Sequence, residues 1–338
     1  MRRSLVLANP EFLPAVAVAR RAEERGFHRV WTTENPGRDA LVRALTIALR
    51  TSTIGVASGI AYAFTRAPLA LAATAADVQE AAQGRFSLGL GSGTQGMRRR
   101  WYGIDDFDHP ASRLGEYADL MRAAWAAEIS FTYSGRFYRG EYHQLDGARP
   151  AVPLWGSGVN ATMLRLAARH FDGVALHPLG AHLAYLDRVV LPAVAAGRDD
   201  RAVGLAAWRM VSVDADGALA RARGARSLAF YFTTPSYGPV ADETGWGDVA
   251  EKVRAGFAGA GTDWAALAAL IPRPMLDEFC LAGTPAEVRD RWAADEPAYA
   301  ARGVTEVVFQ TAASVGGVPG DGLVNLHRIV DTLGEERA

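Results

Sequence analysis

Short apolar runs alternate with longer amphipathic segments along the first third of the chain. We predict strands at residues 4–8, 29–33, 53–59 and 86–91, and helices at about 14–25, 38–50 and 68–83. The strand segments are apolar at nearly every position rather than at every second one. Strands that are apolar on both faces and alternate with helices are typical of a parallel sheet covered by helices.

The alternation stretches after residue 91 and then returns. A helix is predicted at 113–127, strands at 153–156, 173–177, 206–213 and 305–310, and helices at 161–170, 181–196, 218–232 and 323–333. Aromatic and polar residues alternate around Gly135, which predicts a hairpin insertion at about 131–150. A segment rich in Gly, Thr and Pro predicts a second insertion at about 233–275. Thr284, Pro285 and Glu287 begin one more helix, because they supply a cap, a first-turn proline and a capping-box acid.

Eight strand–helix units follow one another without a break in composition. They predict the α/β class and a single (β/α)8 TIM barrel domain over residues 1–338, with the two insertions. The alternative is a doubly wound sheet, which usually carries a phosphate-binding loop after its first strand. Residues 8–11 (Ala-Asn-Pro-Glu) do not form such a loop, and the chain has no Walker loop, HExxH, paired CxxC or GxSxG motif.

Charge and cysteine content narrow the classes of function. The 36 basic and 37 acidic residues give a net charge of −1, so we expect neither a nucleic-acid partner nor an anionic-membrane surface. Cys280 is the only cysteine, which excludes an internal disulfide and indicates a reducing compartment; we predict that it is a buried apolar residue. The first apolar run breaks at Asn9, too early for a signal peptide or a membrane span, so we expect a cytoplasmic protein. The seven histidines include no pair three or four residues apart, and we expect no metal site.

In a barrel of this kind the active site forms at the carboxyl ends of the strands and in the loops that follow. That rule selects Asn9, Glu11, Thr33, Glu34, Asn35, residues 58–62, 92–95 and 155–160, His177 and Arg209. Glu34 ends the second predicted strand and is a candidate acid–base residue. His177 follows an apolar strand and is a candidate proton donor, the alternative being a packed histidine. For the others the alternative is an ordinary loop residue.

Two glycine-rich segments lie among these candidates. Gly89, Gly91 and Gly93 form a GxGxG pattern at a strand end, where glycines allow a flat ring to approach the backbone. Residues 156–160 lie between a strand and a helix, so their amides, Ser157 and the helix N-terminus suit an anion such as phosphate. The alternative is a short turn that uses glycine only for its geometry.

Six segments in this order resemble the bacterial luciferase-like superfamily, over nearly the whole chain. They are residues 26–34 (GFHRVWTTE), 53–60 with the Arg-Ala-Pro of 66–68, 84–93 (GRFSLGLGSG), 153–158 (PLWGSG), 171–174 (FDGV) and 282–287 (AGTPAE). The stretch GIAYAFTRAP, followed by LGLGSGTQ and RRRWYG, is most similar to the branch of the superfamily that depends on deazaflavin, coenzyme F420.

The resemblance implies a set of cofactor contacts. It implies a bulge, often with a non-proline cis peptide bond, at Ser58, Gly59 and Ile60 against the rear face of the ring. It further implies that Glu34, Ser92 and Gly93 line the ring, and that Trp155, Gly156, Ser157, Gly158 and Val159 hold the phosphate. Thr33 and Gln95 complete the expected contacts.

The chain departs from this pattern at two positions. Some deazaflavin dehydrogenases have a histidine after the strand-2 acid and a glutamate after the strand-4 glycines, where this chain has Asn35 and Thr94. The acid–base pair for oxidising an alcohol is therefore missing. We expect an F420-dependent oxidoreductase that reduces an activated C=C or C=N bond in a small-molecule or peptide substrate, in biosynthetic tailoring, with Glu34 or His177 as the proton source.

Two other interpretations stay open. One is a monooxygenase of the same fold that binds FMN and activates oxygen, and the other is a non-catalytic barrel subunit. Barrels of this superfamily often pair through their helices, so we expect a homodimer.

Overall fold

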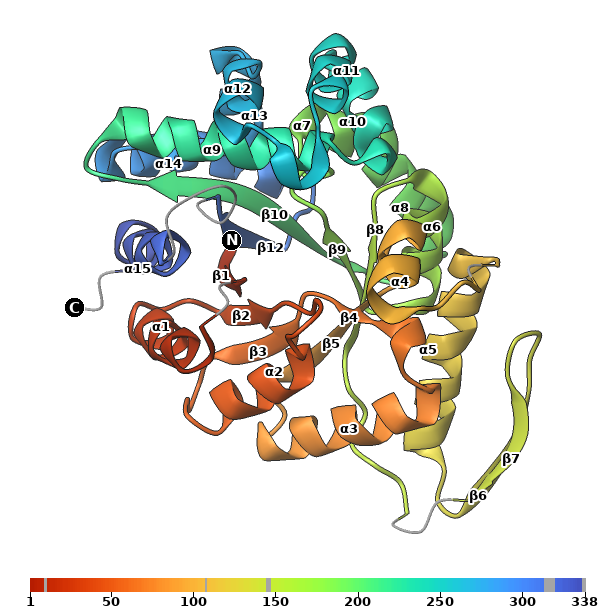
Figure 1. Cartoon of the computed structure of the whole chain (residues 1–338). Coiled ribbons are helices and arrows are strands. Elements are labelled where there is room, and N and C mark those ends of the chain that lie inside the picture. Colours follow the sequence, from red (N-terminus) through yellow and green to blue (C-terminus); the bar gives the residue numbers. More distant parts are fainter. Residues whose placement is uncertain (9–10, 107, 144–146, 313–319, 336–338) are drawn as a thin grey trace. The chain divides into compact units, whose positions relative to one another are not determined.

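The computed structural model describes residues 1–8, 11–106, 108–143, 147–312 and 320–335. Its internal contacts divide the chain into two compact units, each built from strands and helices (Figure 1). Unit 1 comprises Met1–His28, Leu176–Pro192 and Leu205–Ala338, and unit 2 comprises Arg29–Ala175 and Ala193–Gly204. Asn9, one of the predicted strand-end candidates, lies outside the described residues.

Unit 2 is built on parallel strands in the order β2-β3-β5-β8-β9. Their bounds are β2 Arg29–Thr32, β3 Gly55–Ser58, β5 Phe86–Gly91, β8 Leu154–Gly158 and β9 Gly173–Leu176, and the short β4 Ala61–Tyr62 also pairs with β5. The register sets Trp31 opposite Ala57 and Gly89 opposite Trp155. Because the strands are parallel and in register, their carboxyl ends meet along one edge.

Helices connect these strands, and one hairpin stands apart from them. The helices are α2 Ala40–Ala48, η1 Ala63–Thr65, α3 Pro68–Ala81, α4 Gln95–Tyr102, α5 Pro110–Ala126 and α6 Ala161–His170. The antiparallel strands β6 Ser130–Ser134 and β7 Arg139–His143 form the predicted hairpin, which runs beside α5 (Figure 1). The Glu116 side chain on α5 accepts the amide protons of Phe137 at 2.9 Å and Tyr138 at 2.8 Å, which fixes the hairpin turn to the helix.

Unit 1 has parallel strands in the order β11-β10-β12-β1. They are β1 Arg2–Leu7, β10 Gly204–Val213, β11 Cys280–Gly283 and β12 Glu306–Thr311. Its helices are α1 Phe12–Glu24, α7 Leu183–Tyr185, η2 Leu186–Val190, α9 Gly217–Phe232, η3 Pro235–Tyr237, α10 Gly238–Glu243, α11 Gly247–Ala255, η4 Gly259–Gly261, α12 Trp264–Ala269, α13 Arg273–Phe279, α14 Pro285–Ala301 and α15 Asp321–Leu333. The helix α8 Leu191–Gly197 crosses the division between the units.

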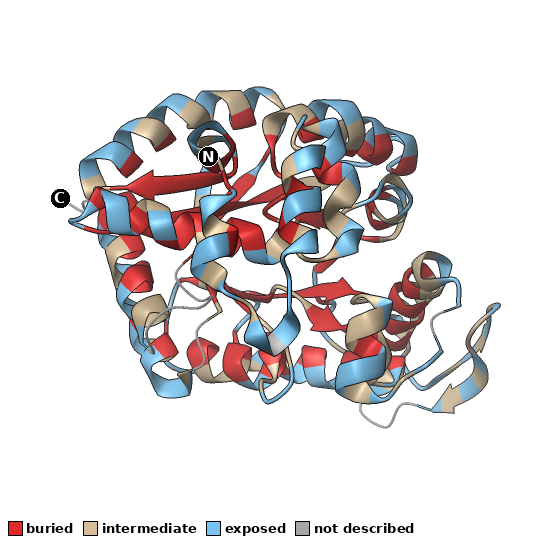
Figure 2. Ribbon diagram, turned by 45° about the horizontal axis from the view of Figure 1, so that its top comes forward, coloured by how far each residue is buried: buried red, intermediate tan, exposed pale blue. Residues whose placement is uncertain are grey.

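The parallel strands are buried in both units, whereas most helices are buried on one side (Figure 2). Trp31, Phe86 and Phe171 are fully buried in unit 2, and Phe279 and Phe309 are fully buried in unit 1. This pattern explains why the strand segments are continuously apolar in the sequence, since each strand packs on both of its faces.

The eight predicted strands all form, as β1, β2, β3, β5, β8, β9, β10 and β12, each within a few residues of its predicted bounds. The capping box of α14 also forms as predicted, with Thr284 as the cap. Not predicted were α4, β4, β11, the helices α10 to α12 inside the second insertion, and α13 at the end of that insertion. Cys280, the first residue of β11, is fully buried as predicted, and burial raises the pKa of its thiol to about 12.

In the described parts of the chain, no helix is both long enough and apolar enough to cross a bilayer.

Candidate functional site

The predicted cofactor residues all belong to unit 2 and follow four neighbouring strands. Thr33 and Glu34 follow β2, Ser58 to Ile60 end β3, Ser92 to Gln95 follow β5, and residues 155–159 end β8. Since the carboxyl ends of parallel strands meet at one edge of a sheet, the topology gathers these groups into one region of unit 2.

The segment at the end of β3 is fixed to both of its neighbours. The Gly59 amide donates to the Thr32 carbonyl at 2.7 Å, and Ser58 Oγ bonds both the amide and the carbonyl of Gly89 at 2.9 Å. The peptide bond between Gly59 and Ile60 is cis, as the family resemblance implies.

The glycines of β5 have a packing role that the sequence interpretation did not include. A Cβ atom on Gly89 would lie 2.1 Å from the Ser58 carbonyl oxygen, and one on Gly91 would lie 2.1 Å from Ile60 Cδ1. These glycines therefore let the end of β3 pack directly on β5, and the space beside them is filled by Ser58 and Ile60. Gly93 differs, because its φ of 65° is the left-handed conformation that turns the chain after β5.

Glu34 is held in an ion-pair cluster. Its side chain is 3% exposed, and Arg66 Nη1 lies 2.9 Å from Oε1 and 3.1 Å from Oε2. Arg66 Nη2 contacts Asp39 Oδ2 at 2.7 Å, while Asp39 Oδ1 caps α2 by accepting two amide protons. Burial raises the pKa of Glu34, and the opposing effect of Arg66 does not cancel it. Asp39 is also partly buried, but the α2 amides and Arg66 outweigh burial and lower its pKa.

The other polar groups at these strand ends differ in whether they already have a hydrogen-bond partner. Thr33 Oγ1 is buried and makes no hydrogen bond to any residue that the structure describes, which leaves a hydroxyl for a polar ring edge. Ser92 Oγ donates to the Gly93 carbonyl at 3.0 Å, and Gln95 is exposed at the start of α4. Thr94 caps α4 by accepting the Met97 amide proton at 3.2 Å. Asn35 forms a bridge with Arg38.

The loop after β8 leads directly into α6. A Cβ on Gly156 would lie 2.8 Å from Ala167 Cβ, and one on Gly158 would lie 2.5 Å from Met163 Cβ, so both glycines let α6 pack close to β8. Asn160 Oδ1 accepts the Met163 amide proton at 3.0 Å, which caps the helix.

In any α-helix the first backbone amides have no acceptor within the helix, and they lie at the positive end of the helix dipole. This holds for the first residues of α6. Ser157 and Val159 are partly exposed beside them. The donor set fits a phosphate group. Trp155 is 9% exposed and packs edge-on against Trp31 at a centroid distance of 5.6 Å, so it supports the loop from the interior.

His177 belongs to unit 1, where aromatic rings enclose it. It stacks on Tyr237 at 4.4 Å and meets Tyr231 edge-on at 4.7 Å. The Leu179 amide donates to His177 Nδ1 at 3.2 Å, which assigns the imidazole proton to Nε2. Burial lowers the pKa of His177 to about 3, so at neutral pH the ring is uncharged and offers an N–H donor. Tyr231, in turn, accepts a hydrogen bond from Gln310.

Sequence reasoning did not select Tyr231, Tyr237 or Gln310, because nothing in the residues around these positions predicts that the two tyrosines contact His177 or that Gln310 bonds Tyr231. It did select Arg209, and this is a correction. Arg209 lies in the middle of β10 rather than at its carboxyl end; it is 3% exposed and donates to the Glu278 carbonyl at 2.6 Å and to Asp295 Oδ2 at 2.9 Å. Arg209 therefore holds helices α13 and α14 to the strand.

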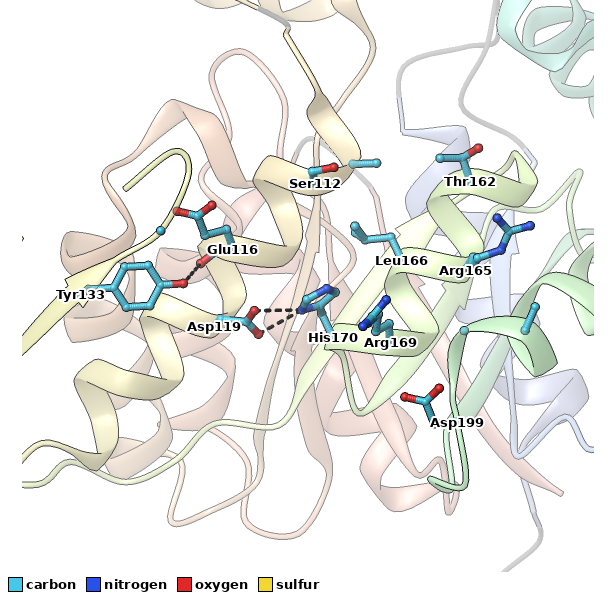
Figure 3. Close-up of a pocket in the computed structure, with 14 residues that line it drawn as sticks. Ser112, Glu116, Asp119, Tyr133, Thr162, Arg165, Leu166, Arg169, His170 and Asp199 are labelled. Carbon is cyan, nitrogen blue, oxygen red and sulfur yellow. Dashed lines mark hydrogen bonds and ion pairs between the residues drawn. The ribbon is translucent and has the colours of Figure 1, made fainter. Parts of the chain in front are cut away.

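A hollow of about 560 Å³ lies elsewhere in unit 2, between α5, α6 and the β6–β7 hairpin (Figure 3). Part of its polar lining is engaged in the fold: Asp119 pairs with His170 Nδ1 at 3.0 Å (Figure 3), and the Glu116 carboxylate accepts amide protons of the hairpin turn. This hollow lies against outer helices rather than at the strand ends. Within the described ranges, no three His, Cys, Asp or Glu side chains are grouped to hold a metal ion.

Comparison with known proteins gives a consistent result. The sequence model of the family described as luciferase-like monooxygenase matches residues 3–306. A 5,10-methylenetetrahydromethanopterin reductase from Methanolobus tindarius is 29% identical over 292 residues, 83% of this chain and 88% of that protein.

Two solved structures share the fold. The coenzyme F420-dependent tetrahydromethanopterin reductase from Methanopyrus kandleri has a TM-score of 0.78, covers 98% of this chain and 97% of its own, and is 19% identical. The oxygenating component of 3,6-diketocamphane monooxygenase from Pseudomonas putida, in complex with FMN, has a TM-score of 0.64, covers 100% and 99%, and is 18% identical. These likenesses confirm the predicted fold class, a (β/α)8 TIM barrel with insertions.

Proposed function

The chain belongs to the luciferase-like monooxygenase family, and from that premise we propose that it is an oxidoreductase that uses coenzyme F420. The reaction proposed is transfer of a hydride from reduced deazaflavin to an activated C=C or C=N bond. The substrate proposed is a small molecule or a peptide, modified in biosynthetic tailoring.

One observation carries this proposal. The predicted cofactor contacts lie at or just after the carboxyl ends of β2, β3 and β5 and along β8 and the turn that follows it, and these are four consecutive strands of one sheet. The donors change along that edge, from the Thr33 hydroxyl and the Glu34 carboxyl at β2 to the amides of α6 beyond β8. A cofactor with a polar ring at one end and a phosphate at the other matches this order. The likeness to the F420-dependent reductase from Methanopyrus kandleri supports the choice of cofactor.

Each group of residues would have its own part in binding. The first amides of α6, with Ser157 and Val159, would hold the phosphate. The segment from Ser58 to Ile60, fixed between Thr32 and Gly89, would support the ring. When bound, deazaflavin supplies a two-electron hydride donor, while the protein supplies position and electrostatics.

Reduction of a double bond also needs a proton for the atom that does not receive the hydride. Glu34 is the carboxyl suited to this, because burial raises its pKa from the ordinary value, so that Glu34 holds its proton to a higher pH. His177, neutral at physiological pH, would donate a hydrogen bond from Nε2 rather than act as an acid. Its place relative to Glu34 stays a prediction.

Asn35 and Thr94 support the proposed direction of the reaction. Neither side chain is a base, and both residues are engaged in the local fold, since Asn35 closes a turn with Arg38 and Thr94 caps α4. Oxidation of an alcohol requires a group that removes the hydroxyl proton, and these positions do not provide one. Reduction requires only a proton donor.

Cofactor binding and oxygen consumption test the proposal. Purified protein titrated with F420 and with FMN should bind F420 more tightly, and the reduced complex should consume oxygen no faster than free reduced cofactor. Tight FMN binding with rapid oxygen uptake would establish the monooxygenase interpretation instead, which the likeness to the FMN complex supports. Binding of neither cofactor would favour a non-catalytic subunit.

We also propose a cytoplasmic homodimer, and light scattering on the purified protein tests the oligomeric state.

A further inference from the structure

The cluster around Glu34 contains more than one ion pair. One guanidinium, Arg66, serves two carboxylates: Nη1 faces both oxygens of Glu34 and Nη2 faces Asp39 at 2.7 Å. The two carboxylates differ in their surroundings, because the Glu34 side chain is 3% exposed and that of Asp39 is 41% exposed. The backbone of Arg66 is fixed as well, because the Tyr117 hydroxyl donates a hydrogen bond to the Arg66 carbonyl at 3.1 Å.

Asp39 has a second set of contacts that fixes it as the ionised partner. Its Oδ1 accepts the amide protons of Leu41 at 2.8 Å and Val42 at 3.0 Å, at the N-terminus of α2, where a negative charge is stabilised. A carboxylate with these contacts stays ionised and keeps its ion pair with Arg66. Glu34 must therefore share the single positive charge beside it.

The remaining ionisable groups around Glu34 are phenols. Tyr62 follows β3 on the short strand β4, Tyr102 ends α4, and Tyr117 lies on α5. Burial raises the pKa of all three, so each stays neutral over the physiological range. The Tyr62 backbone amide also donates to Glu34. Among the described residues facing Glu34, the charges are thus Arg66 and Asp39.

We propose that Asp39 is a positioning residue which, by occupying half of the Arg66 guanidinium, lets Glu34 hold a proton that an undivided Arg66 would displace. Glu34 gives one proton to the substrate, becomes a carboxylate, and regains the proton from water, with Arg66 stabilising the charged form. The inference rests on the proposed function, since such a carboxyl has a use in a reaction that consumes a proton. The inference goes beyond the proposed function in one respect: Asp39, and not Glu34 alone, determines the pH at which Glu34 releases its proton.

The substitution Asp39→Asn tests this directly. Asparagine is among the best capping residues and keeps an oxygen that can cap α2. It removes the negative charge of Asp39 and therefore the ion pair with Arg66. Both changes favour ionised Glu34, so we expect the pH at which Glu34 titrates to fall by about one unit or more. Arg66→Lys should have the opposite effect, because a lysine ammonium cannot bond two carboxylates as a fork. Asp263→Asn is the matched control, since Asp263 caps α12 with the same pair of amide contacts.

The measurement is a carboxyl titration of the cofactor-free protein, by infrared or carbon-13 NMR spectroscopy, with Glu34 identified by the signal that Glu34→Gln removes. A downward shift in Asp39→Asn, with the control unchanged and the melting temperature of both within the wild-type range, supports the inference. An unchanged or upward shift in Asp39→Asn overturns it, and so does a wild-type Glu34 that titrates like an ordinary glutamate.

Because no cofactor or substrate is present, the outcome is independent of whether the chain binds F420. Failure of F420 binding with the titration shift intact would overturn the proposed function alone. If Arg66→Lys does not fold, Asp39→Asn still decides the inference.

Discussion

The contact between β3 and β5 leads to a prediction about stability and cofactor binding. Gly89→Ala adds a single methyl group at a point where a Cβ atom would lie 2.1 Å from the Ser58 carbonyl oxygen and 3.3 Å from the Trp31 ring. The obstacle is backbone, not the end of a flexible side chain. The Ser58 segment must therefore move, and it carries two hydrogen bonds of 2.9 Å to Gly89.

The size of the effect follows from two contributions. Forcing an extra methyl group into a packed interior costs about 1–3 kcal/mol. Each hydrogen bond that is lost or distorted costs roughly a further 1 kcal/mol. We therefore expect Gly89→Ala to lower the free energy of unfolding by about 3–5 kcal/mol and to weaken F420 binding at least about tenfold, since 1.4 kcal/mol of lost support for the ring is a factor of ten.

Gly261→Ala is the matched control. A Cβ atom on Gly261 has no neighbour within 4 Å, and its φ is not positive, so the same methyl group should be neutral or slightly stabilising. Urea unfolding and F420 titration of both variants provide the measurement. The packing argument is refuted if Gly89→Ala unfolds within about 0.5 kcal/mol of wild type, the usual range for a surface substitution.

Further predictions concern the phosphate loop, the acid and the histidine. Asn160→Asp should keep the cap of α6 and the stability of the fold, yet weaken F420 binding measured by calorimetry, because it sets a negative charge beside the cofactor phosphate; equal affinity would argue that the phosphate binds elsewhere. Glu34→Gln should retain F420 binding but lose most turnover with reduced F420, at any pH; full activity would exclude Glu34 as the proton source. His177 should stay uncharged in a histidine NMR titration down to about pH 4, and Tyr237→Ala should raise its pKa toward the ordinary range by admitting water. With a folded-state pKa depressed to about 3, His177 binds a proton more readily in the unfolded chain, so stability should fall as pH drops below about 6.5. His177→Gln should flatten that loss in urea unfolding, and an unchanged slope would contradict the assignment.

The fold was predictable because its strands are short, apolar on both faces and separated by amphipathic helices. What the pattern hid has physical reasons. The helix α4 carries Arg98, Arg99 and Arg100 in eight residues, which obscures an apolar face, and its visible signals are the Thr94 cap and the left-handed Gly103 at its end. The strand β11 is only four residues long, and so short an apolar stretch does not distinguish a strand from a buried helical segment.

The candidate site was predictable at the level of strand ends, but its contacts were not. Nothing in the sequence pairs Glu34 with Arg66, 32 residues away, or gives Arg66 a second partner in Asp39. The glycines of β5 show the converse limit. Their spacing suggested room for a ring, whereas the structure fills the space beside Gly89 and Gly91 with Ser58 and Ile60. Spacing identifies where side chains are small, and only the packed structure identifies what occupies the space.

A crystal structure of the protein grown with F420 tests the central claim most directly. The account predicts the deazaflavin ring against Ser58, Gly59 and Ile60, with Thr33 at its polar edge and the phosphate on the first amides of α6. A ring bound in the hollow between α5 and α6, or a phosphate held away from residues 157–162, would contradict it.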